Sequence, residues 1–244
     1  MLHFSIILYS VGPRPDLALL QIHDLGLFES IFMPALEDPP QLPTEHMAWA
    51  TAAFTYLRSL PSDTSYSNLR TLYESEDDQF IAWLMAALAP WKDRILPGGK
   101  PGREVAAAAT AAREGFKAEN KLLTTIGAAY KNYGAIQKFV NEFWNIPVSR
   151  GKAGMFLRNL GKDWRNQYLC ALLLEVLPQF QQVGVTPTEE AVRIFEKYSK
   201  MLEQIKQMDL LEVWDVKPIL DVGFPDPRSG MLLTWSREMS CVKR

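Results

Sequence analysis

The sequence is poor in the residues that build disulfide frameworks and metal centres. It has two cysteines and three histidines among 244 residues. Cys170 and Cys241 are too few for a disulfide framework, and neither has a metal ligand at close spacing. Cys170 lies in an apolar run, where we expect a buried structural thiol. This cysteine usage fits a reducing, intracellular compartment.

Long hydrophobic runs are also missing. No apolar stretch reaches the roughly 18 residues that a membrane span needs. The apolar start from Met1 to Tyr9 has no basic n-region, no clear cleavage site and no excess of arginine, so we expect neither a signal peptide nor a mitochondrial leader. Hydrophobic residues make up 48% of the chain and charged residues 22%, which excludes wholesale disorder and allows a sizeable core.

Positive and negative charges nearly balance over the whole chain, but they are unevenly distributed along it. The net charge is −2, which by itself says nothing about nucleic acid. Between residues 92 and 165, however, there are 14 Lys or Arg and 6 Asp or Glu, a local balance of +8. A basic middle within an acidic chain fits a site for a polyanion, although the same charges could also lie on solvated helix faces.

The apolar residues recur mostly at helical spacing, which predicts an all-α, multi-helix fold. We expect Asp16, Thr44, Ser75, Ser149 and Thr186 to cap helices, with Pro187 at the first helical position after Thr186. Strand signals are weak and confined to residues 1–9 and 213–222. The expected helices span residues 17–32, 45–60, 75–89, 103–117, 121–130, 135–144, 163–176 and 187–208.

The segment from Pro97 to Gly102 is the clearest break in the pattern. It contains two prolines and three glycines, which favour a linker between two helical layers. We therefore expect an atypical N-terminal segment (1–11), an N-terminal helical layer (12–96), a linker (97–102), a second helical layer (103–212) and a divergent C-terminus (213–244).

Three short patterns invite a catalytic interpretation, and each is weak. His23-Asp24 is shared with metal-dependent phosphohydrolases, but such a site needs further ligands, which the remaining histidines do not obviously supply. Asp77 and Asp78 open a helix, where acids complement the helix dipole. Gly98-Gly99-Lys100 lacks the strand and the Ser or Thr of a phosphate-binding loop. The sequence shows no self-contained active site.

Three segments resemble class II CCA-adding enzymes, the tRNA nucleotidyltransferases, especially those of fungi. The first runs from Gly12 to Phe32 and contains Leu-Gln-Ile-His-Asp-Leu-Gly-Leu. The second is Leu157-Arg-Asn-Leu-Gly-Lys-Asp-Trp-Arg165, and the third is Trp214-Asp-Val-Lys-Pro-Ile-Leu-Asp221. Their order and spacing match the neck, body and tail of that family across residues 11–222.

The resemblance implies a function in tRNA 3′-terminal CCA addition. Enzymes of this family use CTP, ATP and Mg²⁺, with Asp-x-Asp carboxylates in a head domain and an Arg/Asp motif in the neck. Neither motif is found here, and the C-terminus after Asp221 departs from the family pattern. The resemblance therefore implies a tRNA-binding body that is inactive alone, holds no cofactor itself, and comes from a truncated gene model, a splice product or a split gene with a separate catalytic head.

The body would grip the acceptor stem and T arm of tRNA, mainly through phosphates, because such an enzyme must accept every tRNA. If residues 158–165 formed one helix, Arg158, Lys162 and Arg165 would share a face; Gly161 could break it. We expect Trp164 to be a core anchor. Two alternatives remain: a helical protein-interaction scaffold, and a phosphohydrolase built on His23 and Asp24. The candidate RNA-binding residues are Lys100, Arg103, Arg150, Lys152, Arg158, Lys162 and Arg165.

Overall fold

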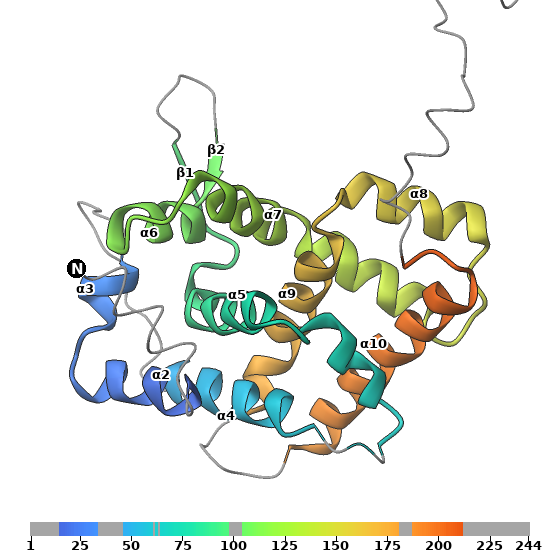
Figure 1. Ribbon diagram of the computed structural model, residues 1–244, viewed down its shortest axis with the longest axis horizontal. Coiled ribbons are helices and arrows are strands. Elements are labelled where there is room, and N and C mark those ends of the chain that lie inside the picture. Colours follow the sequence, from blue (N-terminus) through green and yellow to red (C-terminus); the bar gives the residue numbers. More distant parts are fainter. Residues whose placement is uncertain are drawn as a thin grey trace, which may run out of the picture.

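The computed structural model describes residues 15–33, 46–60, 62, 64–97, 104–180 and 187–211. These residues form a packed group of helices with one short hairpin, so the predicted all-α fold is confirmed (Figure 1). The elements are α2 (Pro15–Asp24), α3 (Phe28–Phe32), α4 (His46–Arg58), η1 (Ser67–Leu72), α5 (Glu76–Ala87), η2 (Ala89–Trp91), β1 (Ile95–Pro97), β2 (Glu104–Ala106), α6 (Ala107–Gly115), α7 (Asn120–Phe143), α8 (Arg150–Leu160), α9 (Trp164–Val176), η3 (Leu177–Gln179) and α10 (Glu189–Gln207).

Helix α9 is the centre of the packing. Its residues are buried on nearly every side, because its sequence is apolar all round rather than along one stripe. Helices α5, α7 and α10 pack against it (Figure 1). The Tyr168 hydroxyl on α9 donates a hydrogen bond to the Tyr198 carbonyl on α10 at 2.8 Å, and Tyr130 on α7 donates to the Met85 carbonyl at 2.8 Å. The helices are therefore joined by buried polar contacts as well as by apolar packing.

Buried aromatic residues fill the space around α9. Trp83, Trp91 and Trp164 are each at most 1% exposed, which confirms the prediction that Trp164 is a core anchor. The indole nitrogen of Trp91 donates to the Phe32 carbonyl at 2.8 Å, which ties α3 to the segment after α5. Cys170 is fully buried, as expected, and burial raises the pKa of its thiol. It is therefore structural and poorly reactive.

Two of the predicted helix caps, Ser75 and Ser149, are confirmed, and the cap predicted for α10 is wrong. The side chain of Ser75 accepts a hydrogen bond from the Asp78 amide at 3.1 Å, and that of Ser149 accepts from the Lys152 amide at 3.3 Å. At α10 the cap is Thr188, which accepts from the Ala191 amide at 3.1 Å, and not Thr186. The helix begins two residues later than predicted, with Glu189 and Glu190 in its first turn, where acids complement the dipole.

Glycine alone did not predict where helices end. The expected helix over residues 17–32 is two helices, because Gly26 adopts a left-handed conformation (φ 64°) between α2 and α3. Its predicted cap is also wrong, since α2 begins at Pro15 and includes Asp16. By contrast, the two helices expected over residues 121–144 are one helix, α7, which runs through Gly134.

A hairpin stands where the sequence predicted only a linker and a helix. Strand β1 pairs antiparallel with β2, with Leu96 opposite Val105, so helix α6 begins at Ala107 rather than at residue 103. A hydrogen bond from the Ala107 amide to the Arg94 carbonyl (3.0 Å) closes its base. Each strand has only three residues, too few to show a strand pattern in the sequence.

Several predictions lie outside the described residues: the cap Thr44, the linker residues 98–102, Lys100, Arg103, and the segments 1–11 and 213–244. The division into two helical layers stays a prediction; α5 on one side of it packs against α9 on the other. Among the described helices, none is long and apolar enough to cross a membrane.

Candidate nucleic-acid interface

Five of the predicted RNA-binding residues lie within the described structure, on α8 and at the start of α9. Arg150, Lys152 and Arg158 are on α8, Lys162 lies between the helices, and Arg165 is in the first turn of α9. All five are exposed to solvent. The structure therefore brings these cations together along one chain segment, with their charged ends accessible to a ligand.

Helix α8 is held in place by its local sequence. Pro147 and Ser149 end the preceding segment, and the Ser149 hydroxyl caps the new helix. Ala153, Leu157 and Leu160 are buried beneath it. This one-sided burial leaves the basic residues on the outer side of the helix.

Gly161 breaks the helix, so the continuous helix that a single basic stripe required is not formed. Helix α8 ends at Leu160, and Gly161 follows with φ 86° and ψ −174°, a conformation that residues with a side chain rarely adopt. Arg158, Lys162 and Arg165 therefore belong to a helix end, a turn and the next helix. They remain close in sequence and exposed, but they do not share one helical face.

The five cations differ in how far they are already engaged. Lys152 forms a 3.1 Å salt bridge with Glu142 and lies 4.0 Å from the centroid of the Phe143 ring. Arg165 donates to the Leu211 carbonyl at 3.3 Å and lies beside the Trp164 ring. No salt bridge within the described part of the chain involves the other three, Arg150, Arg158 and Lys162. Those three can meet a phosphate without first losing a charged partner.

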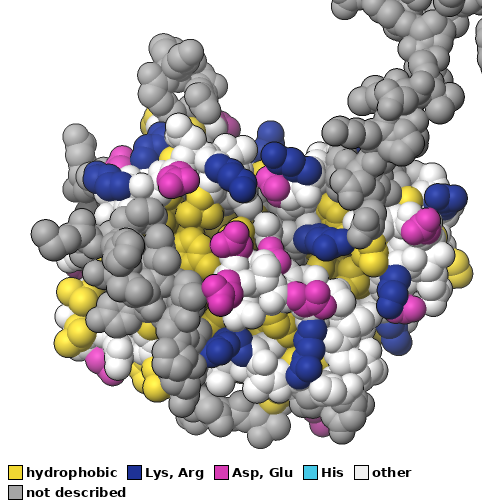
Figure 2. Space-filling model, in the orientation of Figure 1, with side chains coloured by type: hydrophobic (Ala, Val, Ile, Leu, Met, Phe, Trp, Pro, Cys, Tyr) yellow, Lys and Arg dark blue, Asp and Glu magenta, His cyan; other side chains and the backbone are white. Residues whose placement is uncertain are grey.

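The surface around these residues is mixed in charge. Figure 2 shows Lys and Arg side chains along the upper edge and right-hand side of this face, with Asp and Glu side chains between them. Such a surface offers scattered positive charges rather than one continuous basic groove. It fits recognition of a folded RNA through a few separated phosphates better than the tracking of a long strand.

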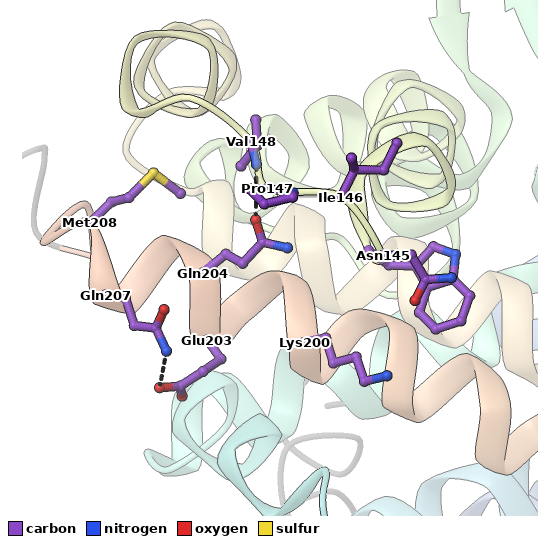
Figure 3. A pocket seen from close by; sticks show the side chains of 10 residues that line it. Asn145, Ile146, Pro147, Val148, Lys200, Glu203, Gln204, Gln207 and Met208 are labelled. Carbon is purple, nitrogen blue, oxygen red and sulfur yellow. Dashed lines mark hydrogen bonds between the residues drawn. The ribbon is translucent and has the colours of Figure 1, made fainter.

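A cleft lies next to α8, between α10 and the segment that joins α7 to α8 (Figure 3). Its volume is about 500 Å³. Trp144 and Lys200 lie on its two sides, with the lysine nitrogen 5.0 Å from the centroid of the indole ring. Sequence reasoning missed both residues because they are far apart in the chain, and Lys200 lies outside the basic middle. The aromatic residue at the end of α7 and the polar face of α10 are the only local signals for them.

The structure does not support a metal site at His23-Asp24 or at Asp77-Asp78. His23 and Asp24 are exposed at the end of α2, while His46 is buried and its Nε2 is 3.2 Å from the Ala87 carbonyl oxygen. Burial lowers the pKa of His46 to about 4, so its ring is neutral at physiological pH. Asp77 and Asp78 are in the first turn of α5, as predicted. Among the described residues, no three His, Cys, Asp or Glu side chains form a group that could hold a metal ion.

Comparison with known proteins relates the chain to nucleotidyltransferases. It is 31% identical over 176 residues to the nucleotidyltransferase lcsQ of Purpureocillium lilacinum, a match that covers 66% of this chain and 28% of the relative. It is 20% identical over 210 residues to the tRNA nucleotidyltransferase cca2 of Schizosaccharomyces pombe, covering 86% of this chain and 40% of that protein. No protein-family profile and no solved structure matches the chain.

These matches establish a distant relationship to nucleotidyltransferases, in agreement with the resemblance seen in the sequence. The chain spans well under half the length of either curated relative. The relationship therefore concerns the part of those proteins that aligns with this helical chain.

Proposed function

We propose that this chain is the helical, tRNA-binding body of a CCA-adding tRNA nucleotidyltransferase, and that it does not add nucleotides alone. The observation that supports this most directly is the similarity to the tRNA nucleotidyltransferase cca2 over 86% of the chain. The exposed cations of α8 and α9 supply the chemistry that such a body needs, because Arg150, Arg158 and Lys162 are exposed and form no salt bridge with another described residue.

The division of labour follows from the residues present. Metal-assisted nucleotidyl transfer needs carboxylates that hold Mg²⁺ against a triphosphate. The 244 residues contain no Asp-x-Asp motif. In this proposal a catalytic head supplies those carboxylates and binds CTP and ATP, while the body positions the acceptor stem and T arm of tRNA. The contacts are to phosphate and sugar, so that every tRNA is accepted by its shape.

The test is binding of purified chain to tRNA that lacks its terminal CCA. We expect affinity to fall steeply as salt rises, since each phosphate that is neutralised releases counterions. Incubation with the same tRNA, CTP, ATP and Mg²⁺ should give retention of RNA without incorporation of nucleotide. Affinity that is independent of salt would contradict the RNA-binding role, and elongation by the chain alone would contradict the division of labour.

One observation favours a second candidate, a scaffold that docks a protein such as a separate catalytic head. Leu25 and Leu27 are 70% and 40% exposed at the turn between α2 and α3. Exposed apolar residues on both sides of a turn fit a protein contact. Co-purification of a partner that survives nuclease treatment and is lost in Leu25→Ser would favour this role. A partner released by nuclease would instead be held through RNA.

A further inference from the structure

The cleft beside α8 has a rigid floor. Gln204 on α10 reaches across to the segment between α7 and α8. Its side-chain oxygen accepts a hydrogen bond from the Val148 amide at 3.1 Å (Figure 3), and its side-chain nitrogen donates to the Phe143 carbonyl at 3.1 Å. These two bonds fix the backbone on both sides of Trp144, Ile146 and Pro147. The cleft is therefore formed before any ligand arrives, which lowers the entropic cost of binding.

The size and lining of the cleft fit one small planar ligand. Its volume of about 500 Å³ falls within the usual range for small-molecule sites, about 300 to 1,000 Å³. One side presents the half-buried ring of Trp144, and the other presents polar side chains of α10. Asn145, next to Trp144 in the chain, adds an amide group, while Gln207 lies about two turns beyond Lys200 on α10. An aromatic surface with an amide nearby is suited to a nucleobase, which has a flat face and a polar edge.

Lys200 supplies the charge for the phosphate of the same nucleotide. Its ammonium lies over the Trp144 ring, and no salt bridge within the described ranges involves it. A cation–π contact at an exposed site contributes only about 0.5 to 1 kcal/mol, so the lysine can leave the ring at small cost. The nearby carboxylate, Glu203, is 3.3 Å from the Gln207 side-chain nitrogen, from which it accepts a hydrogen bond.

The position of the cleft continues the interface proposed above. The segment that forms its floor leads through Ser149 directly into Arg150 and Lys152 of α8. The cations at the start of α8, which would hold an RNA backbone, are therefore close in sequence to the residues that line the cleft. An acidic peptide would satisfy Lys200, but it has no flat face to cover the Trp144 ring.

We propose that this cleft binds one unpaired RNA nucleotide, with its base stacked on Trp144 and its phosphate paired with Lys200. Stacking on an aromatic ring tolerates any base, so the site would add affinity for an unpaired end or loop without selecting a sequence. This inference rests on the proposed function, since it gives the same RNA interface a second, base-dependent contact.

The test compares two probes on the full chain: a ten-nucleotide single-stranded RNA, and an abasic ribose-phosphate chain of the same length. Stacking contributes about 1 to 3 kcal/mol per base, so we expect the base-containing RNA to bind about tenfold tighter. Trp144→Ala should remove this difference, and Trp144→Phe should keep most of it. Lys200→Ala should weaken binding of both probes, whereas Lys200→Arg should not. Arg193→Ala, which removes an exposed charge on the same helix, is the control and should change neither value.

Equal affinity of the unchanged chain for the two probes would overturn the inference about the cleft. The proposed function would still hold in that case if tRNA binding were sensitive to salt. Base-dependent binding to the oligonucleotide together with no binding to tRNA would support the cleft and overturn the proposed function. If Trp144→Ala left the difference between probes intact but released a protein partner, the cleft would be a protein contact and the inference wrong. Circular dichroism of each variant checks folding, and the Phe and Arg variants keep the test valid if Trp144→Ala does not fold.

Discussion

Phe139 on α7 and Phe156 on α8 stack face to face, with their ring centroids 3.9 Å apart and their planes 2° from parallel. Helix α8 has few other ties to the core, since only three of its side chains are buried. This ring pair therefore fixes the orientation of the helix that carries three of the predicted RNA-binding cations. The stability of the candidate interface depends on an apolar contact on its inner side.

Phe156→Ala should therefore destabilise the chain and weaken RNA binding together. Loss of a large packed ring costs about 3 kcal/mol or somewhat less here, because Phe156 is only partly buried. Urea unfolding measures the first effect and a tRNA titration the second. Met155→Ala is the matched control, since Met155 is 66% exposed on the same helix. An equal loss of stability in the control would show that the ring stack has no special role.

Two glycines that look alike in the sequence should respond to alanine in opposite directions. A β-carbon at Gly115 would lie 1.8 Å from the Ile31 carbonyl oxygen, a backbone atom that cannot move aside without shifting α3. Gly115→Ala should cost about 3 kcal/mol or more. Gly134 lies within α7, and apart from the helix's own nearby backbone no described atom is within 4 Å of such a carbon, so Gly134→Ala should stabilise by about 1 kcal/mol. Thermal unfolding of both variants checks the pair, and destabilisation by Gly134→Ala would refute the helix-propensity argument.

The same two glycines show what sequence patterns can and cannot predict. Local signals identified the helical class, the caps at Ser75 and Ser149 and the central apolar helix, because each depends on residues within one or two turns. The continuity of α7 through Gly134 depends on packing against α9, which outweighs the propensity cost of one glycine. The close approach of Gly115 to α3 depends on residues more than 80 positions apart and has no local signal.

In the candidate site, too, the sequence predicted local features but not tertiary contacts. The basic middle of the sequence made Arg150, Arg158 and Lys162 candidates because composition is visible in a window of sequence. Composition could not show that Lys152 is already paired with Glu142. Nor could it show that Lys200 lies over Trp144, 56 positions away. Side-chain pairing and clefts between helices are properties of the tertiary fold, so they became visible only in the structure.

His46 should make the chain sensitive to mild acid. Burial is the main cause that lowers its pKa from 6.5 to about 4; the hydrogen bond to Ala87 opposes this, and the charge of His23 adds to it. Above pH 6.5 the ring is neutral in both states. As the pH decreases from 6.5 to 4, the unfolded chain takes up the proton before the folded chain does. The free energy of unfolding therefore decreases as the pH decreases over this range, by roughly 3 kcal/mol in all.

Unfolding in urea at a series of pH values measures this loss. His46→Gln retains a side-chain donor that can reach the Ala87 carbonyl but cannot be protonated in this range. Its stability should therefore vary less than that of the unchanged chain between pH 6.5 and 4. Identical slopes for the two proteins would show that other groups cause the acid sensitivity.

Arg158 and Arg165 should differ in what their removal costs. Arg158 is exposed and forms no salt bridge within the described ranges. Arg158→Ala should therefore change the free energy of unfolding by no more than about 0.5 kcal/mol. It should reduce the salt dependence of tRNA binding by the equivalent of about one phosphate contact. Arg165 also donates to the Leu211 carbonyl, so Arg165→Ala should lower both RNA affinity and the free energy of unfolding. Measurements of tRNA affinity at several salt concentrations, together with urea unfolding, separate the two effects.

The control is Arg193→Ala, which removes an exposed charge from α10 and should leave the salt dependence of tRNA binding unchanged. A slope that drops equally in all three variants would mean that RNA senses only the net charge of the chain, and that the cations of α8 and α9 form no defined interface.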